Sequence, residues 1–327
     1  MYYNLSLLKL LHGEFETGLP MYESRWKDKQ ANLQIKNFKE PLWLGVENIQ
    51  GKTILLHAEQ GQGDFIQFCR YALEVEKLGA TVILEVPAIL FELAKTLSDN
   101  FTCVIKDTPL PAFDLHCPLL SLPLAFNTRL ESIPAKVPYL KAPENKKLLW
   151  NNKLGDNQFG DNKLGKSKLG KSKLTRIGIV WSGTTLHLND HNRSISLSQL
   201  GSLFNLSAEF HVLQKEVRAS DEGALKLLQT FNHVKVHQYD LHDFVDTAAL
   251  ISEMDLVISV DTSVAHLAGA LAAPVWVLLS YIPDFRWLLD REDSPWYPTA
   301  RLFRQAKQGD WAEVIERVIQ ALEAEFI

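Results

Sequence analysis

Residues 261–266 read Asp-Thr-Ser-Val-Ala-His and place two hydroxyl side chains and one imidazole directly after an apolar run. The pattern predicts a buried strand, an abrupt polar turn and a helix of small residues. A helix N-terminus presents unpaired backbone N–H groups and about half a positive charge, so it can hold a phosphate group without a further cation. Thr262 and Ser263 can add hydroxyl donors, and His266 lies one turn along on the face of Thr262. In the alternative interpretation, Asp261 or Thr262 only caps the helix and His266 is a core histidine.

A second candidate site lies at residues 61–64, Gly-Gln-Gly-Asp, between the apolar run 53–58 and a helical pattern. Two glycines between a strand and a helix allow the backbone to approach a ligand closely. Gly63 and Asp64 would then lie at the carboxyl end of the strand, where parallel sheets bind their ligands. Aspartate at a helix start is also a common cap, so the pattern alone leaves both roles open for Asp64.

The same glycines resemble the start of a dinucleotide-binding fingerprint, G-x-G-x-x-G, which would indicate an NAD-dependent enzyme. Such a site also requires an acidic residue about 20 positions later, and Glu85 could supply it. Ile66, however, occupies the place of the third glycine. The dinucleotide hypothesis therefore accounts for this segment only in part.

The length of 327 residues and a hydrophobic content of 46% allow a sizeable core and suggest two domains. The net charge of −5 disfavours a general nucleic-acid binder, and no apolar run approaches the ~20 residues that would span a membrane. Residues 5–11 are too short and too interrupted for a signal peptide. Cys69, Cys103 and Cys117 lack metal-ligand spacing and lie in apolar stretches, so we expect reduced thiols in a cytoplasmic protein.

Residues 152–174 form a tandem pentapeptide repeat rich in glycine, asparagine, serine and lysine. The period is too short for a repeat-protein unit, so we expect a flexible linker. Six lysines against two aspartates leave a basic nucleic-acid-binding tail as the alternative. The chain then has four predicted parts: a helical stub at 1–40, an N-terminal lobe at 41–147, the linker at 148–175 and a C-terminal lobe at 176–327.

Short apolar runs alternate with helical patterns on both sides of this linker. Continuous apolar strands joined by helices indicate parallel sheets that are covered on both faces. We therefore expect an α/β protein with two Rossmann-like, doubly wound lobes that face a cleft, and ligands beyond the carboxyl ends of the strands. The expected strands are residues 53–58, 81–86, 102–105 and 113–117 in the first lobe, and 177–181, 209–213, 234–239, 256–260 and 275–279 in the second.

The segment before Pro41 has a different pattern. Residues 12–26 resemble the second half of a tetratricopeptide-type helical hairpin, in which a glycine-flanked turn precedes a helix that carries Tyr22, Arg25 and Trp26. A single unit of this kind cannot bury its own apolar face. We expect it to dock on the neighbouring lobe or on a protein partner.

Several of these segments together resemble the heptosyltransferase-like glycosyltransferases. The similarity is greatest to the bacterial proteins that fuse tetratricopeptide repeats to such a domain, and it covers about residues 5–145 and 175–325. Its specific motifs are Gly-Ile-Val-Trp-Ser-Gly at 178–183, His187, residues 190–194 with Arg193, Leu-Gln-Lys at 213–215, and residues 243–250, 261–271, 293–298 and 302–305.

This resemblance implies a GT-B architecture with a nucleotide-sugar donor in the C-terminal lobe. The acceptor, a glycan, a lipid or a protein, would lie against the N-terminal lobe. Asp64 matches the general base of the family, and residues 262–266 match its diphosphate site. Gly63 and Asp261, directly before these two positions, are further candidate donor contacts. Arg193 falls near a basic residue that contacts the phosphates, and Lys215 or Glu216 would lie near the ribose or the base. The implied activity is inverting hexosyl or heptosyl transfer.

The residues also fit this chemistry without the family. Inverting sugar transfer needs one base for the acceptor hydroxyl and fixed donors for the departing diphosphate. Asp64 can be that base, while Arg193 and the helix start can replace a metal ion. Ser182 and Gly183 are candidate phosphate or sugar contacts at a strand end, whereas Trp181 before them fits the core. We therefore expect neither a metal nor a cofactor.

Two further interpretations remain open. His187, Asp190 and His191 could suggest a metal site, although their loop setting favours solvated residues or donor contacts. A catalytically silent nucleotide-sugar-binding protein or scaffold would also agree with the helical stub and with an N-terminal lobe of only about 100 residues.

Overall fold

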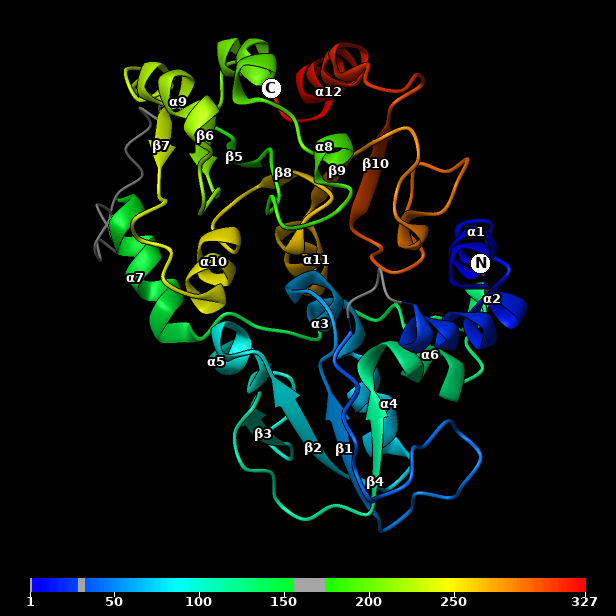
Figure 1. Cartoon of the computed structure of the whole chain (residues 1–327). Coiled ribbons are helices and arrows are strands. Elements are labelled where there is room, and N and C mark those ends of the chain that lie inside the picture. Colours follow the sequence, from blue (N-terminus) through cyan, green and yellow to red (C-terminus); the bar gives the residue numbers. More distant parts are fainter. Residues whose placement is uncertain (1, 29–32, 156–173) are drawn as a thin grey trace. The chain divides into compact units, whose positions relative to one another are not determined.

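The computed structural model describes residues 2–28, 33–155 and 174–327. These residues form two compact units, each with a parallel sheet of its own (Figure 1). Unit 1 comprises Met1–Lys141 and Pro283–Pro298, and unit 2 comprises Ala142–Ile282 and Thr299–Ile327. Because Pro283–Pro298 comes back to unit 1 late in the chain, we call it the returning segment.

Unit 1 contains a four-stranded sheet. In spatial order its strands are β3 (Thr102–Ile105), β2 (Thr81–Val86), β1 (Thr53–His57) and β4 (Leu115–Pro118). All neighbouring pairs are parallel. The central strand β1 is buried from Ile54 to its end, as expected for a strand covered on both faces. His57 at that end lies beside Glu85 of β2 in the register.

The helices of unit 1 are short. The apolar face that the sequence presents over residues 65–78 is divided between two helices, because the chain turns at Cys69 and Arg70. Both of these residues are buried. The helical elements after the first strand are α3 (Gln62–Phe68), α4 (Tyr71–Lys77), η2 (Ala88–Leu90), α5 (Phe91–Ala94), η3 (Leu119–Ser121), α6 (Leu122–Ala125), η4 (Leu130–Ser132) and, in the returning segment, η8 (Phe285–Trp287).

Three helical elements precede this sheet: α1 (Tyr2–Leu11), α2 (Phe15–Tyr22) and the 3-10 helix η1 (Glu23–Lys27). Gly13 turns the chain between α1 and α2 with a φ of +78°, a conformation that favours glycine. Gly18 allows the two helices to approach closely, because a Cβ atom there would lie 2.8 Å from Cδ2 of Leu10. Both helices belong to unit 1, and their relation to tetratricopeptide repeats stays a prediction.

Unit 2 contains a six-stranded parallel sheet. In spatial order its strands are β10 (Ala300–Arg304), β9 (Val275–Leu279), β8 (Leu256–Val260), β5 (Arg176–Val180), β6 (Glu209–Val212) and β7 (Val234–Val236). Its helical elements are α7 (Glu144–Leu154), α8 (Asp190–Arg193), η6 (Leu197–Asn205), η7 (Ala219–Asp221), α9 (Glu222–Leu228), α10 (Phe244–Ile251), α11 (Ser263–Ala270) and α12 (Trp311–Glu325). The strand β10 was not predicted.

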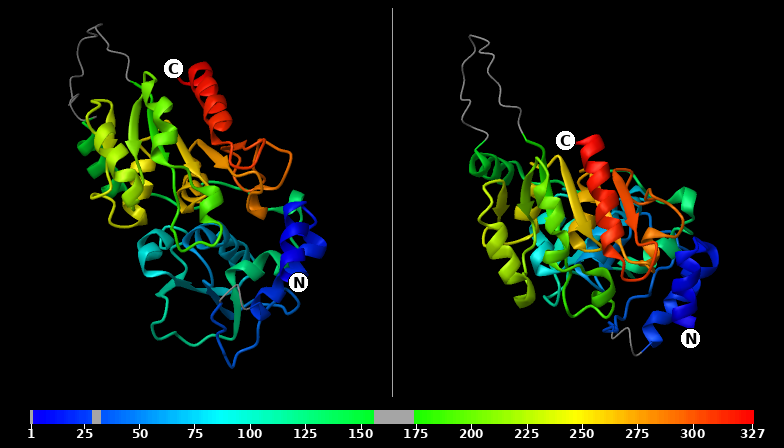
Figure 2. Two further views of the ribbon diagram at one scale, coloured as in Figure 1. Left: turned by 45° about the horizontal axis from the view of Figure 1, so that its top comes forward. Right: turned by 90° about the horizontal axis from the view of Figure 1, so that it is seen from above.

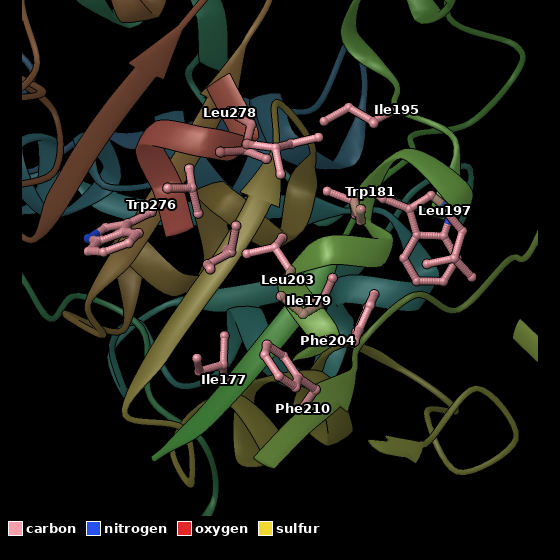
Figure 3. Close-up of a cluster of buried hydrophobic side chains, with 14 of the residues drawn as sticks. Ile177, Ile179, Trp181, Ile195, Leu197, Leu203, Phe204, Phe210, Trp276 and Leu278 are labelled. Carbon is pink, nitrogen blue, oxygen red and sulfur yellow. The ribbon is translucent and has the colours of Figure 1, made fainter. Parts of the chain in front are cut away.

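One hydrophobic cluster of unit 2 lies on the face of its sheet that the last helix covers. Ile179 and Phe210 project from β5 and β6 into this cluster (Figure 3). Val314, Val318 and Leu322 of α12 pack into the same cluster, and α12 lies beside β10 (Figure 2). Complete burial of such a side chain contributes roughly 1.5–3 kcal/mol, so these three residues bind α12 firmly to the sheet. No helix in the described part of the chain is long and apolar enough to cross a membrane.

Two predicted boundaries differ from the structure. The linker was expected from residue 148, but α7 continues to Leu154 because Trp150 is buried and Gly155 ends the helix in the left-handed conformation. Residues 156–173, most of the predicted linker, lie outside the described residues. The returning segment was expected in the C-terminal lobe, but it belongs to unit 1, where Trp287, Trp296 and Tyr297 are buried.

Candidate functional site

The N-terminus of α11, in unit 2, is the first candidate site. Thr262 is the N-cap residue by its extended backbone, but its side chain accepts no capping hydrogen bond. Its hydroxyl lies instead 3.1 Å from the hydroxyl of Ser259, which is buried in β8. The first N–H groups of a helix have no partner within the helix, so those of α11 can donate to a bound anion. His266 is 5% exposed and its Nε2 lies 3.9 Å from Oδ1 of Asp261.

Arg193 brings a cation to this helix start. Its Nη1 donates a hydrogen bond of 2.9 Å to the backbone carbonyl of Asp261. Gly183 makes room for the guanidinium, because a Cβ atom at this position would lie 2.5 Å from Nη2 of Arg193. The structure thus brings together Gly183, Arg193 and Asp261, three residues predicted from the sequence to contact a donor.

A network of polar side chains holds the loop that carries Arg193. Nη2 of Arg218 donates to the carbonyl of Gly183 at 3.1 Å and to Oγ of Ser194 at 3.0 Å, and it pairs with the Asp190 carboxylate. Ser194 in turn donates to Oδ1 of Asp190 at 2.8 Å. Asp190 is therefore occupied by ion pairs and hydrogen bonds, which removes the main ligand from the alternative metal site. Both histidines of that alternative, His187 and His191, are exposed.

Gln214 fixes the backbone at the end of β5. Its Oε1 accepts hydrogen bonds from the N–H groups of Trp181 at 3.2 Å and Ser182 at 3.1 Å, while its Nε2 donates to the Ser182 carbonyl at 2.9 Å. Trp181 is fully buried and its indole N–H donates to Asp221 at 2.9 Å, so it is a core residue. The Ser182 hydroxyl is buried and has no hydrogen-bond partner within the described residues, which is consistent with a group that a ligand would satisfy.

The predicted ribose or base contacts lie in a different environment. Lys215 and Glu216 are exposed, and Nζ of Lys215 donates to the Gln238 carbonyl at 3.3 Å. Gln214 was predicted only as part of the motif at residues 213–215, without a role in the site, and Arg218 was not predicted. Gln214 was visible at the end of a predicted strand, but no local pattern indicated that Arg218 would reach back to Gly183.

A second candidate site lies at Asp64, in unit 1. Asp64 lies in the first turn of α3, after Gly63, and its Oδ2 accepts a hydrogen bond of 2.7 Å from the N–H of Gly61. Oδ1 pairs with Nη2 of Arg286 in the returning segment. Asp64 thus does cap its helix, and its other oxygen contacts a cation that no sequence pattern predicted.

A buried ion pair lies at the end of β1, five residues before Asp64. The guanidinium of Arg25 is fully buried and binds Glu59 through two hydrogen bonds, of 2.9 and 3.2 Å. It also donates to Ser121 at 2.7 Å and to Glu23 at 2.6 Å. Burial raises the pKa of Glu59 to about 7, although Arg25 acts in the opposite direction. Arg25 therefore ties the N-terminal helices to the strand end that positions Asp64.

Glu85 does not match the acidic residue of a dinucleotide site. Its residue exposure is 1%, and Oε1 pairs with Nζ of Lys36. A carboxylate that binds ribose hydroxyls must be accessible at the strand end. The geometry of Glu85, together with Ile66 at the third glycine position, disfavours the NAD-dependent enzyme.

Comparison with known proteins gives evidence that is independent of this geometry. Residues 241–320 match the family model of glycosyltransferase family 9 (heptosyltransferase). This family 9 segment contains Asp261, Thr262, Ser263 and His266, whereas Asp64 and Arg193 lie outside it.

Two solved structures show the fold. A glycosyl transferase family 9 protein from Veillonella parvula is 12% identical, with 86% of this chain and 98% of that chain covered and a TM-score of 0.54. The ADP-heptose lps heptosyltransferase II of E. coli is 14% identical, with 83% and 98% covered and a TM-score of 0.51. The fold is therefore of the GT-B class, as the sequence predicted.

A curated relative extends over almost the whole chain. Protein FlbA of Caulobacter vibrioides is 24% identical over 351 residues, which cover 98% of this chain and 54% of FlbA. The chain thus spans about half the length of this relative.

Proposed function

We propose that this chain is a glycosyltransferase that moves a hexosyl or heptosyl group from a nucleoside-diphosphate donor to a hydroxyl acceptor, with inversion. The family 9 segment supports transfer of this kind. The observation that carries the proposal is the contact of Arg193 with the Asp261 carbonyl, which fixes a cation at the start of α11. The acceptor is a glycan, a lipid or a protein.

The diphosphate of the donor would bind at the start of α11. A helix N-terminus stabilises an anion by about 0.3–1 kcal/mol, and each hydrogen bond to a charged group adds about 1.5–3 kcal/mol. Thr262 and Ser263 would add hydroxyl donors, and Ser182 and Gly183 would contact the phosphates or the sugar. Lys215 or Glu216 would contact the ribose or the base from the exposed end of β6.

The reaction needs a base and a stabilised leaving group. In our proposal the acceptor oxygen attacks the anomeric carbon and gives its proton to Asp64. The bond from that carbon to the diphosphate breaks, and the electron pair stays on the phosphate oxygen. Arg193 and the helix start would neutralise the developing charge, so the proposed mechanism uses neither a metal ion nor a cofactor.

A second candidate function is a silent protein that binds nucleotide sugars without transferring them. The observation that favours it is the environment of Asp64, since both of its oxygens already have partners within unit 1. Each carboxylate oxygen has a second lone pair, so Asp64 can still accept a proton. Turnover therefore has to decide between the two functions.

The deciding experiment is a panel of ligands with two readouts. A nucleoside diphosphate and its sugar ester should raise the melting temperature in a thermal-shift assay. ADP-heptose is the first donor to test, because one of the solved structures is an ADP-heptose heptosyltransferase, and other nucleotide sugars follow. Release of the nucleoside diphosphate should then accompany transfer to acceptors. Binding without release from any donor would support the silent protein, and stabilisation by NAD alone would overturn both functions.

A further inference from the structure

The returning segment brings one charged side chain to Asp64. Arg286 follows Asp284 and Phe285 in this segment, and its Nη2 pairs with Oδ1 of Asp64 across 222 positions of sequence. We propose that Arg286 is a positioning residue that holds the Asp64 carboxylate in one orientation for proton transfer. This inference rests on the proposed function, in which Asp64 is the base.

Arg286 is itself held in place on several sides. Its side chain is 8% exposed, and its Nη1 donates to Oδ1 of Asp284 at 2.7 Å. The guanidinium lies over the rings of Phe285, at 4.6 Å, and Phe68, at 5.3 Å. Burial alone would lower the pKa of Arg286, but the carboxylates of Asp284 and Asp64 raise it above its ordinary value. Arg286 therefore remains positively charged beside Asp64, and its contacts leave the guanidinium little freedom to move.

Other residues attach the returning segment to unit 1. Arg70 is 2% exposed, and its Nη1 donates to the Trp296 carbonyl at 2.7 Å. The guanidinium of Arg70 also lies 4.7 Å from the ring centre of Tyr297. Since Trp287, Trp296 and Tyr297 are buried as well, the segment does not depend on Arg286 for its attachment.

Two contacts on opposite oxygens restrict Asp64 more than a helix cap would. The Gly61 N–H holds Oδ2 and Arg286 holds Oδ1, so rotation of the carboxylate would break at least one of these contacts. A base held in this way needs no reorganisation before it accepts a proton, and a displacement of about 1 Å can cost about 10²-fold in rate. Capping of the helix involves only Oδ2, so it does not account for the ion pair between Oδ1 and the buried guanidinium of Arg286.

The test compares two arginines of the same segment. Arg286→Met keeps an unbranched side chain and removes the charged guanidinium, and Arg286→Lys keeps the charge. The control is Arg291→Met, because Arg291 belongs to the same segment and pairs with the exposed Asp293 instead of Asp64. With ADP-heptose or the active donor, we expect Arg286→Met to lower kcat about 10²-fold and to leave the donor KM unchanged. Arg286→Lys should recover part of the lost kcat. The control Arg291→Met should have the kcat of the parent. An unchanged kcat in Arg286→Met would overturn the inference.

A second measurement keeps the inference separate from the proposed function. Chemical unfolding of Asp64→Asn, Arg286→Met and the double variant forms a double-mutant cycle. If Arg286 holds Asp64, the double variant should lose less stability than the two single losses added together, and strict additivity would overturn the positioning role. Should no donor support turnover in the parent protein, the proposed function fails, while the cycle still decides whether Arg286 holds the carboxylate.

Discussion

Nη1 of Arg193 lies 2.9 Å from the backbone carbonyl oxygen of Asp261, the residue before the N-cap of α11. Because the acceptor is a backbone carbonyl, the contact does not depend on the side chain at position 261. The guanidinium is only partly exposed, with 14% of its side-chain surface accessible. It is therefore already in place beside the first N–H groups of the helix before any donor arrives.

Arg193→Ala should weaken the binding of a nucleoside diphosphate by about 1.5–3 kcal/mol, the range for a hydrogen bond to a charged group. Isothermal titration measures this, with Arg317→Ala as the control, because Arg317 pairs with Glu313 on α12. Affinity that is unchanged in both Arg193→Ala and Thr262→Ala would contradict the diphosphate site at α11.

Gly183→Ala should weaken the same binding without replacing any charged group. The added methyl group would lie 2.5 Å from Nη2 of Arg193, and the flexible guanidinium would have to move away from the helix start. We expect roughly tenfold weaker binding, or about 1.4 kcal/mol, with little change in melting temperature. Gly201→Ala is the matched control, since a Cβ atom there meets no atom within 4 Å. Equal affinities in the two variants would refute the role of Gly183.

Asp64→Asn should leave donor affinity unchanged and lower sugar transfer by about 10² to 10⁴, the usual contribution of a positioned base. Asparagine also caps helices well, so the N-terminus of α3 should be retained. Steady-state kinetics with an active donor and acceptor gives the answer. A variant that transfers sugar at the parental rate would leave Asp64 with the capping role alone.

Glu59 should make stability depend on pH. Its pKa is raised by burial from 4.5 to about 7, so between these values the folded protein binds more protons than the unfolded chain. The contribution of Glu59 to the free energy of unfolding therefore falls as pH rises through this window, by at most about 1.4 kcal/mol per pH unit, and is constant above pH 7.

Urea unfolding of Glu59→Gln and the parent at pH 5, 6 and 7 measures this contribution as a difference between the two proteins. The difference should change with pH in this window, whereas Glu74→Gln, which removes an exposed pair with Lys77, should give a constant difference. A pH-independent difference for Glu59→Gln would show that its carboxyl is charged throughout.

The sequence predicted the sheets better than the contacts between distant residues. Continuous apolar runs located strands such as β1 and β8, because a strand buried on both faces has no polar alternation. The run at β10 was not recognised as a strand, since its two arginines at residues 301 and 304 interrupt the apolar pattern. The order of these elements predicted two doubly wound α/β lobes, and the resemblance to the heptosyltransferase-like glycosyltransferases implied the GT-B class, which the solved structures confirm.

The candidate site residues were predictable from a local pattern only where they follow a strand, whereas Arg193 in α8 came from the family resemblance. Ser182 and Thr262 lie two residues after β5 and β8, and Asp64 lies in the first turn of the helix that follows β1, where a local pattern is enough to locate a ligand-facing turn. The partners of these residues come from elsewhere: Arg286 is 222 positions from Asp64, and Arg218 is 35 positions from Gly183. Contacts of this kind depend on the tertiary arrangement of the loops. The periodicity of the sequence carries no information about which distant residues will pair.

The returning segment also determines how this protein can be dissected. The chain passes from one unit to the other after Lys141, again after Ile282 and a third time after Pro298, so a single cut cannot yield two complete domains. A fragment of residues 142–327 would expose Phe285, Trp287 and Trp296, and should aggregate when expressed alone. A fragment of residues 1–141 would keep Arg70 without its carbonyl partner at Trp296. Unit 1 can therefore be produced alone only when the returning segment is joined to residue 141 by a designed linker.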